Sequence, residues 1–165
     1  MRAAHVTPLL DRPPLAALPA EHLCDLSIDL EPAQVIRTPL GTRLTYIVRS
    51  GVVTGPRLRG RLLPGGGDWV TVGDDSAGRL DVHATLRTDD GALIHYESRG
   101  VSVVPPDGRS RLDAGEPIPF EQSYIRMTPK FETAIPAYAW LNAIVILGYV
   151  ELSPNHIDHR MYQIA

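Results

Sequence analysis

One segment of the chain spaces four polar side chains two residues apart. Asp81, His83, Thr85 and Arg87 alternate there with Val82, Ala84 and Leu86. Residues two apart share one face of a β-strand, so this strand has an unusually polar face. If that face points into a closed interior, Asp81 could orient His83, and His83 could exchange a proton with a bound substrate. If it points outward, the same residues are simply solvated. The sequence leaves both interpretations open.

The neighbouring strand is predicted from a tight turn. Asp90–Gly91 is typical of the centre of a two-residue hairpin loop, because Gly and Asp tolerate the positive φ angles that such loops require. Pairing the two strands outward from this turn puts Tyr96 on the same face as His83. The two residues are then a candidate acid–base pair, and Asp81 would orient His83. The predicted pairs are Arg87 with Ile94, Thr85 with Tyr96, and His83 with Ser98.

A second candidate catalytic pair flanks a predicted turn at Pro129–Lys130. Arg126 and Glu132 lie on either side of it. A salt bridge on the surface is the structural interpretation. Burial of either charge would be costly unless the charge is paired or used, so burial would favour a site.

Aromatic residues are the candidate walls of a ligand cavity. Ligand cavities are lined mainly by apolar and aromatic side chains with a few polar groups, although Trp69 and Trp140 could equally fill a core. We expect Trp69 and Trp140 to line one cavity with Asp81, His83 and Tyr96. The candidate ligand-binding residues are Asp68, Trp69, Tyr46, Tyr124, Phe131, Tyr138 and Trp140.

The run Pro64–Trp69 (PGGGDW) does not predict a phosphate site. A phosphate loop leads into a helix and carries a lysine or hydroxyl, whereas an aspartate, a tryptophan and a predicted strand follow here. The glycines instead favour a sharp bend at a barrel corner, which Asp68 could cap. Close approach of the backbone to a ligand is the alternative.

Metal and covalent chemistry are not expected. His156 and His159 are three apart in a predicted strand and should face opposite sides. Cys24 is the single cysteine, so there is no internal disulfide, no cysteine-built zinc site and no recognisable Cys–His pair. We therefore predict no metal and no cofactor.

The elements that must position these residues are mostly strands. Fourteen glycines and fifteen prolines separate short segments of alternating polarity. The pattern predicts an all-β, antiparallel barrel of about nine strands. One short helix is expected at 135–142, and the loop at 105–119 is of a length often found in lids. The predicted strands are 24–30, 44–48, 52–63, 68–72, 79–87, 92–104, 120–128, 143–151 and 156–164.

Composition limits the partners and the location. With 16 basic and 19 acidic residues the net charge is -3, so nucleic acid is disfavoured. No apolar run resembles a signal peptide or a membrane span, so we expect a soluble, cytoplasmic protein without a membrane partner. Residues 1–20, with four prolines, are predicted to form an extended arm, and 21–165 a single barrel domain.

Several motifs, in order, resemble one family, the domain of unknown function 3237, also called uncharacterised protein family 0311. The resemblance spans roughly residues 22 to 164 and implies a lipocalin-like barrel, but no reaction. The resembling residues are Gly55–Trp69 (GPRLRGRLLPGGGDW), Leu86–Ala92 (LRTDDGA), Arg126, Phe131–Thr133 and Tyr138–Asn142.

These observations lead to one functional hypothesis and two alternatives. A closed barrel of this size can hold one small hydrophobic molecule, and an acid and a base in a dry cavity could cyclise, isomerise or otherwise rearrange it. We therefore lean towards an enzyme that needs no cofactor. A non-catalytic carrier and a structural barrel that acts through oligomerisation are the alternatives, and a homo-oligomer is left open. Paired ionisable groups would favour the enzyme, apolar walls alone the carrier, and a filled interior the structural role.

Overall fold

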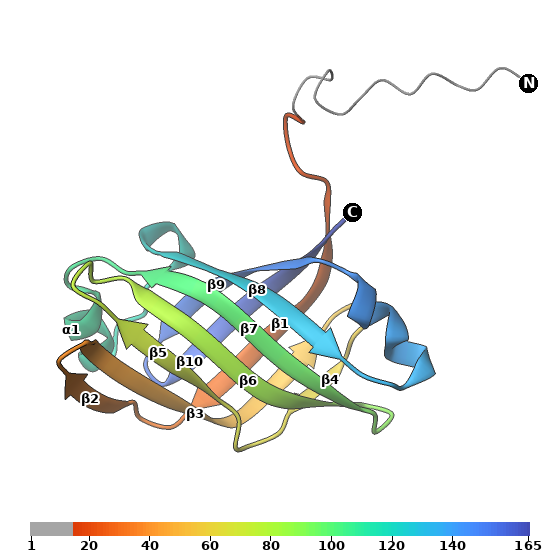
Figure 1. Ribbon diagram of the computed structural model, residues 1–165, viewed down its shortest axis with the longest axis horizontal. Coiled ribbons are helices and arrows are strands. Elements are labelled where there is room, and N and C mark those ends of the chain that lie inside the picture. The colour runs from red at the N-terminus through yellow and green to blue at the C-terminus, as the bar shows by residue number, and fades with distance from the viewer. Residues whose placement is uncertain (1–14) are drawn as a thin grey trace, which may run out of the picture.

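The computed structural model describes residues 15–165, in which ten antiparallel β-strands form one continuous sheet (Figure 1). Three short helices connect them: α1 (Gly108–Asp113) and the 3-10 helices η2 (Phe120–Gln122) and η3 (Pro136–Ala143). The strands are β1 (Ala20–Leu30), β2 (Gln34–Thr38), β3 (Gly41–Thr54), β4 (Gly60–Leu62), β5 (Gly67–Val72), β6 (Gly78–Thr88), β7 (Leu93–Val103), β8 (Tyr124–Glu132), β9 (Ile146–Ser153) and β10 (His156–Ile164).

The sheet closes on itself. Its order runs β1-β10-β9-β8-β7-β6, then β4 and β5 both pair with β6 and with β3, and β3 pairs with β1. This is a closed, eight-stranded antiparallel barrel with two additional strands, one of which, β2, pairs with β3 at one end. Closure leaves the barrel strands without free edges. The predicted fold class is confirmed.

Alternation of side chains builds the core. In β1, Cys24, Leu26 and Ile28 are buried, and Asp25 and Asp29 lie on the other face, as the sequence pattern predicts. Core side chains pack at the barrel end that carries η3 and the β6–β7 hairpin (Figure 1). Fully buried side chains there include Leu58, Leu86, Ile94, Phe131 and Leu141.

Some elements differ from the sequence prediction. The predicted strand 44–48 and the start of 52–63 belong to one long strand, β3, which passes through Gly51. The rest of 52–63 forms a turn and the short β4. The predicted helix is a 3-10 helix, and α1 lies inside the predicted loop. Strand β2 was not predicted, because its residues lack burial and alternation: Gln34–Arg37 are all exposed.

The predicted N-terminal arm falls mostly outside the described residues. Of the interval 1–20, the structure describes only 15–20, where Leu15 and Leu18 are exposed and Ala20 begins β1. The arm and its boundary with the barrel therefore stay predictions. Within 15–165, no helix is long and apolar enough to cross a membrane.

The predicted register of the β6–β7 hairpin is wrong by one residue. Thr88 N–H donates to the Ala92 carbonyl and Gly91 N–H to the Thr88 carbonyl, so the loop has three residues, with Gly91 at φ +94°. This is a three-residue loop with a left-handed bulge position, rather than the expected two-residue turn. A slip of one residue moves every side chain to the other face. The observed pairs are Arg87 with Leu93, Thr85 with His95, Ala84 with Tyr96, and His83 with Glu97.

Candidate functional site

The barrel interior holds a cavity of about 890 Å³. It lies in the half of the barrel opposite η3, and residues of β2, α1 and the β9–β10 turn line its rim. The volume falls in the usual range for small-molecule sites. Its walls are mainly aliphatic, and they include Leu30, Leu44, Val48, Val70, Leu80, Val82, Ile125 and Leu152.

Helix α1 is positioned at the mouth of this cavity. Arg109, Leu112 and Asp113 of α1 contribute to the lining, and Arg37 of β2 adds a further charge at the rim. The loop at 105–119, predicted from its length to resemble a lid, therefore covers part of the opening. Charges gather at the rim, whereas the walls below are apolar.

The glycine run before β5 places Asp68 in the cavity wall. Gly65 turns the chain at φ +98°, as the bend interpretation predicts. A Cβ on Gly66 would lie 2.6 Å from the His83 carbonyl oxygen, and one on Gly67 would lie 2.5 Å from the Tyr46 carbonyl oxygen. Only glycine allows both neighbouring strands to approach so closely. The strand that follows then points Asp68 inward.

Asp68 does not cap the bend. Its Oδ1 accepts the Asp81 N–H of β6 at 3.0 Å, across a gap in the β5–β6 ladder between Asp68–Val82 and Thr71–Arg79. Burial raises the pKa of Asp68 from 3.8 to about 6, although the Asp81 N–H bond acts in the opposite direction. Near neutral pH both the acid and the carboxylate are therefore accessible, which suits proton transfer.

Two tyrosines share the cavity with Asp68. Tyr46 pairs directly with Asp68 in the β3–β5 ladder, and burial raises its pKa. Tyr96 is fully buried, and its hydroxyl lies close to that of Ser98 without forming a hydrogen bond of good geometry among residues 15–165. Burial also raises the pKa of Tyr96. Both phenols remain protonated, so each offers an O–H donor to a ligand.

A buried histidine completes the polar lining. His159 of β10 is 3% exposed, and burial lowers its pKa to about 4, so it is neutral at neutral pH. From its sequence position, His159 was a candidate only for a metal ligand. His159 is two residues from both Ile157 and Met161 in β10, so it shares their inward face, and this spacing could have placed it inside the barrel. His156 lies on the other face and contacts Asp29 at 2.8 Å, as the spacing predicts.

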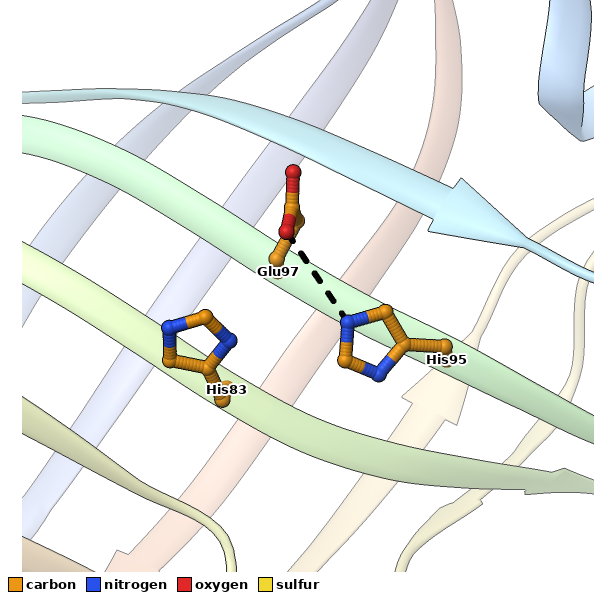
Figure 2. A group of neighbouring side chains, drawn as sticks. All are labelled: His83, His95 and Glu97. Carbon is orange, nitrogen blue, oxygen red and sulfur yellow. Dashed lines mark ion pairs between the residues drawn. The ribbon is translucent and has the colours of Figure 1, made fainter.

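The predicted catalytic strand face points outward. His83 and Asp81 do contact each other, with Nε2 and Oδ1 3.1 Å apart, but on the outer face of β6. His83 lies there beside His95 and Glu97 (Figure 2). Tyr96 points inward from the next strand. The expectation that His83 and Tyr96 share a face is therefore wrong, because the three-residue loop shifts the register.

Arg126 and Glu132 also lie away from the cavity and do not pair with each other. Arg126 donates to the Ile125 carbonyl at 2.9 Å, and its guanidinium lies over the rings of Phe120, Tyr124 and Tyr149. Glu132 is exposed and pairs with Lys130 at 2.5 Å. Neither charge is buried, so the condition that would have favoured a site is not met.

The other aromatic candidates have structural positions. Trp69 is 44% exposed on the outer face, so the expected shared cavity with Trp140 and His83 is wrong. Trp140 stacks under the Arg57 guanidinium, 3.7 Å from the ring centre. Phe131 packs on Tyr96, and the Tyr138 hydroxyl donates to Asp90 at 3.0 Å. Of the predicted site residues, those that line the cavity are Tyr46, Asp68 and Tyr96.

Comparison with known proteins agrees with this architecture. A conserved protein of unknown function from Rhodopseudomonas palustris has a solved structure with a TM-score of 0.85 at 24% identity, and the match covers 92% of this chain and all of that one. A β-barrel-like protein from Acinetobacter baumannii gives a TM-score of 0.76 at 28% identity, covering 94% and 99% of the two chains. An enzyme from Penicillium herquei gives 0.66 at 21% identity, covering 94% and 98%.

Sequence relatives point the same way. A UPF0311 protein from Clostridium acetobutylicum is 31% identical over 126 residues, which span 76% of this chain and 80% of that protein. The family described as "Protein of unknown function (DUF3237)" matches residues 19–164. The resemblance predicted from the sequence motifs is confirmed, and the chain belongs to the DUF3237 family.

Proposed function

We propose that the barrel binds one small, largely apolar organic molecule and catalyses its cyclisation, isomerisation or a related rearrangement by proton transfer. Asp68 is the group that takes up and returns the proton. Tyr46 and Tyr96 orient the substrate through their hydroxyls. The observation that carries the proposal is a carboxyl group with a pKa of about 6 in the wall of an apolar cavity.

The surroundings of Asp68 favour reaction over simple binding. One of its oxygens is held by the Asp81 N–H, which fixes the carboxyl relative to the sheet. In a cavity with few competing polar groups, a carboxylate is poorly solvated and therefore a stronger base than in water. The unpartnered Tyr96 hydroxyl is costly in a core unless a ligand accepts its hydrogen bond.

A non-catalytic carrier remains the second candidate, because most of the lining is aliphatic. The cavity of about 890 Å³ argues against the structural alternative, which requires a filled barrel interior. The fold also accommodates catalysis in at least one protein, since the Penicillium herquei neighbour is described as an enzyme. Fold likeness does not transfer a reaction, so the argument depends on Asp68.

A model proton-transfer reaction tests the proposal without knowledge of the natural substrate. In the ring opening of 5-nitrobenzisoxazole, a base removes the proton on carbon, the N–O bond breaks, and a coloured cyanophenolate is released. We expect the protein to accelerate this reaction above buffer, with half of the maximal rate at pH about 6, where Asp68 is half ionised. Asp68→Asn should lose the acceleration.

The matched controls separate enzyme from carrier. Asp74→Asn removes an exposed carboxylate in the β5–β6 turn that does not line the cavity, and it should leave the rate unchanged. N-phenyl-1-naphthylamine, an uncharged fluorophore, should bind wild type and Asp68→Asn alike. Binding of the fluorophore with no acceleration by wild type would favour the carrier, and equal rates for wild type and Asp68→Asn would exclude Asp68 as the base.

A further inference from the structure

Three potential metal ligands converge on the outer face of the barrel, away from the cavity. His83 of β6 pairs directly with Glu97 of β7, and His95 precedes Glu97 by two residues, so all three side chains emerge on one side of the sheet. Figure 2 shows the two imidazoles facing each other across the strands, with Glu97 beside them. The ring centres are 6.2 Å apart and the planes are inclined by 28°.

Their donor atoms are close enough to share one ion. One donor atom from each residue lies within 4.8 Å of the others, and His95 Nε2 is 3.9 Å from Glu97 Oε2. Ligands of tetrahedral zinc lie about 2.0–2.2 Å from the ion and therefore roughly 3.3–3.6 Å from one another. Small side-chain rotations close the difference. The side chains are 38% to 45% exposed, so an ion can enter and water can complete the coordination.

A fourth residue orients the first ligand. His83 Nε2 contacts Asp81 Oδ1 at 3.1 Å, which leaves His83 Nδ1 available for an ion. Metal-binding histidines usually donate their second ring N–H to a carboxylate or carbonyl, which fixes the ring and increases its basicity. Arg99 lies 3.5 Å from the same Asp81 oxygen and holds that carboxylate in place. The cluster therefore has a supporting contact as well as ligands.

One neighbouring charge opposes cation binding. Lys130 Nζ lies 3.7 Å from Glu97 Oε1 and competes for this carboxylate. It also contacts Glu132 at 2.5 Å, so it keeps a partner when Glu97 turns to an ion. Removing the Lys130 charge should therefore strengthen cation binding.

We propose that His83, His95 and Glu97 bind one divalent transition-metal ion of the zinc or copper type. Two imidazoles and one carboxylate suit these ions, whereas calcium and magnesium prefer oxygen ligands alone. Three protein ligands leave an open coordination position for water or an anion. The site is separate from Asp68 and independent of the proposed reaction.

Trp69 supplies a reporter for this site. Its ring centre is 6.1 Å from that of His83, whereas Trp140 lies beside Arg57. In a Trp140→Phe background, Cu²⁺ should quench the fluorescence that remains from Trp69. Zn²⁺ binding to the full-length chain, stripped with EDTA, is measured in parallel by calorimetry. We expect each titration, with Cu²⁺ or with Zn²⁺, to show one ion bound per chain.

Matched variants localise the ion. His83→Ala and His95→Ala should each weaken Zn²⁺ binding at least tenfold, and Lys130→Gln should strengthen it. His22→Ala removes an exposed histidine on β1 that contacts Asp25, and it should bind Zn²⁺ as wild type does. The proposal is overturned if wild type binds no Zn²⁺, if neither His83→Ala nor His95→Ala weakens binding, or if His22→Ala weakens it equally. Circular dichroism establishes that each variant is folded.

Discussion

Tyr46 lies directly opposite Asp68 in the β3–β5 ladder, and both side chains face the cavity. Directly opposed residues of antiparallel strands have Cβ atoms about 4.5–5.5 Å apart, so a ligand that contacts one can reach the other. The Asp68 charge adds to the effect of burial in raising the pKa of Tyr46 and of Tyr96. A proton on Asp68 therefore favours ionisation of both phenols, and the three groups form one electrostatic unit.

The first prediction concerns the pH dependence of stability at Asp68. A carboxyl with a folded-state pKa of about 6 and an ordinary value of 3.8 binds more protons when folded than when unfolded between these values. The contribution of Asp68 to the free energy of unfolding therefore falls as pH rises from 3.8 to about 6, by about 2–3 kcal/mol in total. Asp68→Asn, which keeps an oxygen for the Asp81 N–H, should raise the free energy of unfolding at pH 8 by about that amount.

Urea unfolding of wild type and Asp68→Asn at pH 4 and at pH 8 measures this difference. Asp74→Asn is the control, because Asp74 is exposed in the β5–β6 turn and does not line the cavity, so it should not reproduce the effect. A difference at pH 8 no larger than at pH 4 would show that burial does not penalise the Asp68 carboxylate.

The second prediction is that His159 makes stability depend on pH in the opposite direction. Its folded-state pKa of about 4 lies below the ordinary 6.5, so the unfolded chain binds more protons between these values. Stability should be lost as pH falls from 6.5 through 4, by about 3 kcal/mol in total. His159→Gln removes this titration and should flatten the loss on acidification, whatever its own cost in packing.

The measurement is the change in free energy of unfolding between pH 7 and pH 4 within each variant. The contributions of Asp68 and His159 offset each other in wild type. Asp68→Asn should then lose more stability on acidification than wild type, and His159→Gln should lose less. The same slope in all three proteins would contradict both pKa shifts.

Tyr96→Phe tests whether the unpartnered hydroxyl is kept for a ligand. Removing a buried hydroxyl that has no partner should raise the free energy of unfolding by about 1 kcal/mol, because its desolvation is uncompensated. The same change should raise the Michaelis constant for 5-nitrobenzisoxazole if the hydroxyl donates to the bound molecule. Ser98→Ala, which removes the buried hydroxyl beside that of Tyr96, is the comparison, because it leaves the Tyr96 hydroxyl in place without this neighbour. A loss of stability in Tyr96→Phe would indicate that the hydroxyl has a structural role.

Much of the barrel could be predicted from the sequence because its strands alternate clearly. The pattern around Cys24 in β1 and the full span of β10 were predicted with the correct faces or bounds. Strand β2 was not, since its exposed residues stabilise no core and its position depends on pairing with β3. Alternation of polar and apolar residues indicates a strand with one buried face. An exposed strand at the barrel end does not need this alternation, so its sequence does not reveal it.

The site was harder to predict because it depends on one residue of register. Asp90–Gly91 is compatible with either a two-residue or a three-residue loop, and the bulge at Gly91 decides whether Tyr96 or Glu97 shares the face of His83. Asp68 was among the candidates, but its raised pKa depends on a cavity assembled from strands distant in sequence. His159 was missed as a cavity residue for the same reason.

The two tryptophans offer a final test of the inside and outside assignment. Trp69 is 44% exposed on the outer face, so Trp69→Ala should change the free energy of unfolding by less than about 1 kcal/mol. Trp140 is partly buried under Arg57 and packs against the core, so Trp140→Ala should cost at least about 2 kcal/mol. Neither lines the cavity, and both variants should bind N-phenyl-1-naphthylamine as wild type does, when measured under conditions where each is fully folded. Weaker binding in Trp69→Ala would place that side chain in the ligand site and contradict the outward orientation of the whole β5–β6 face, including His83.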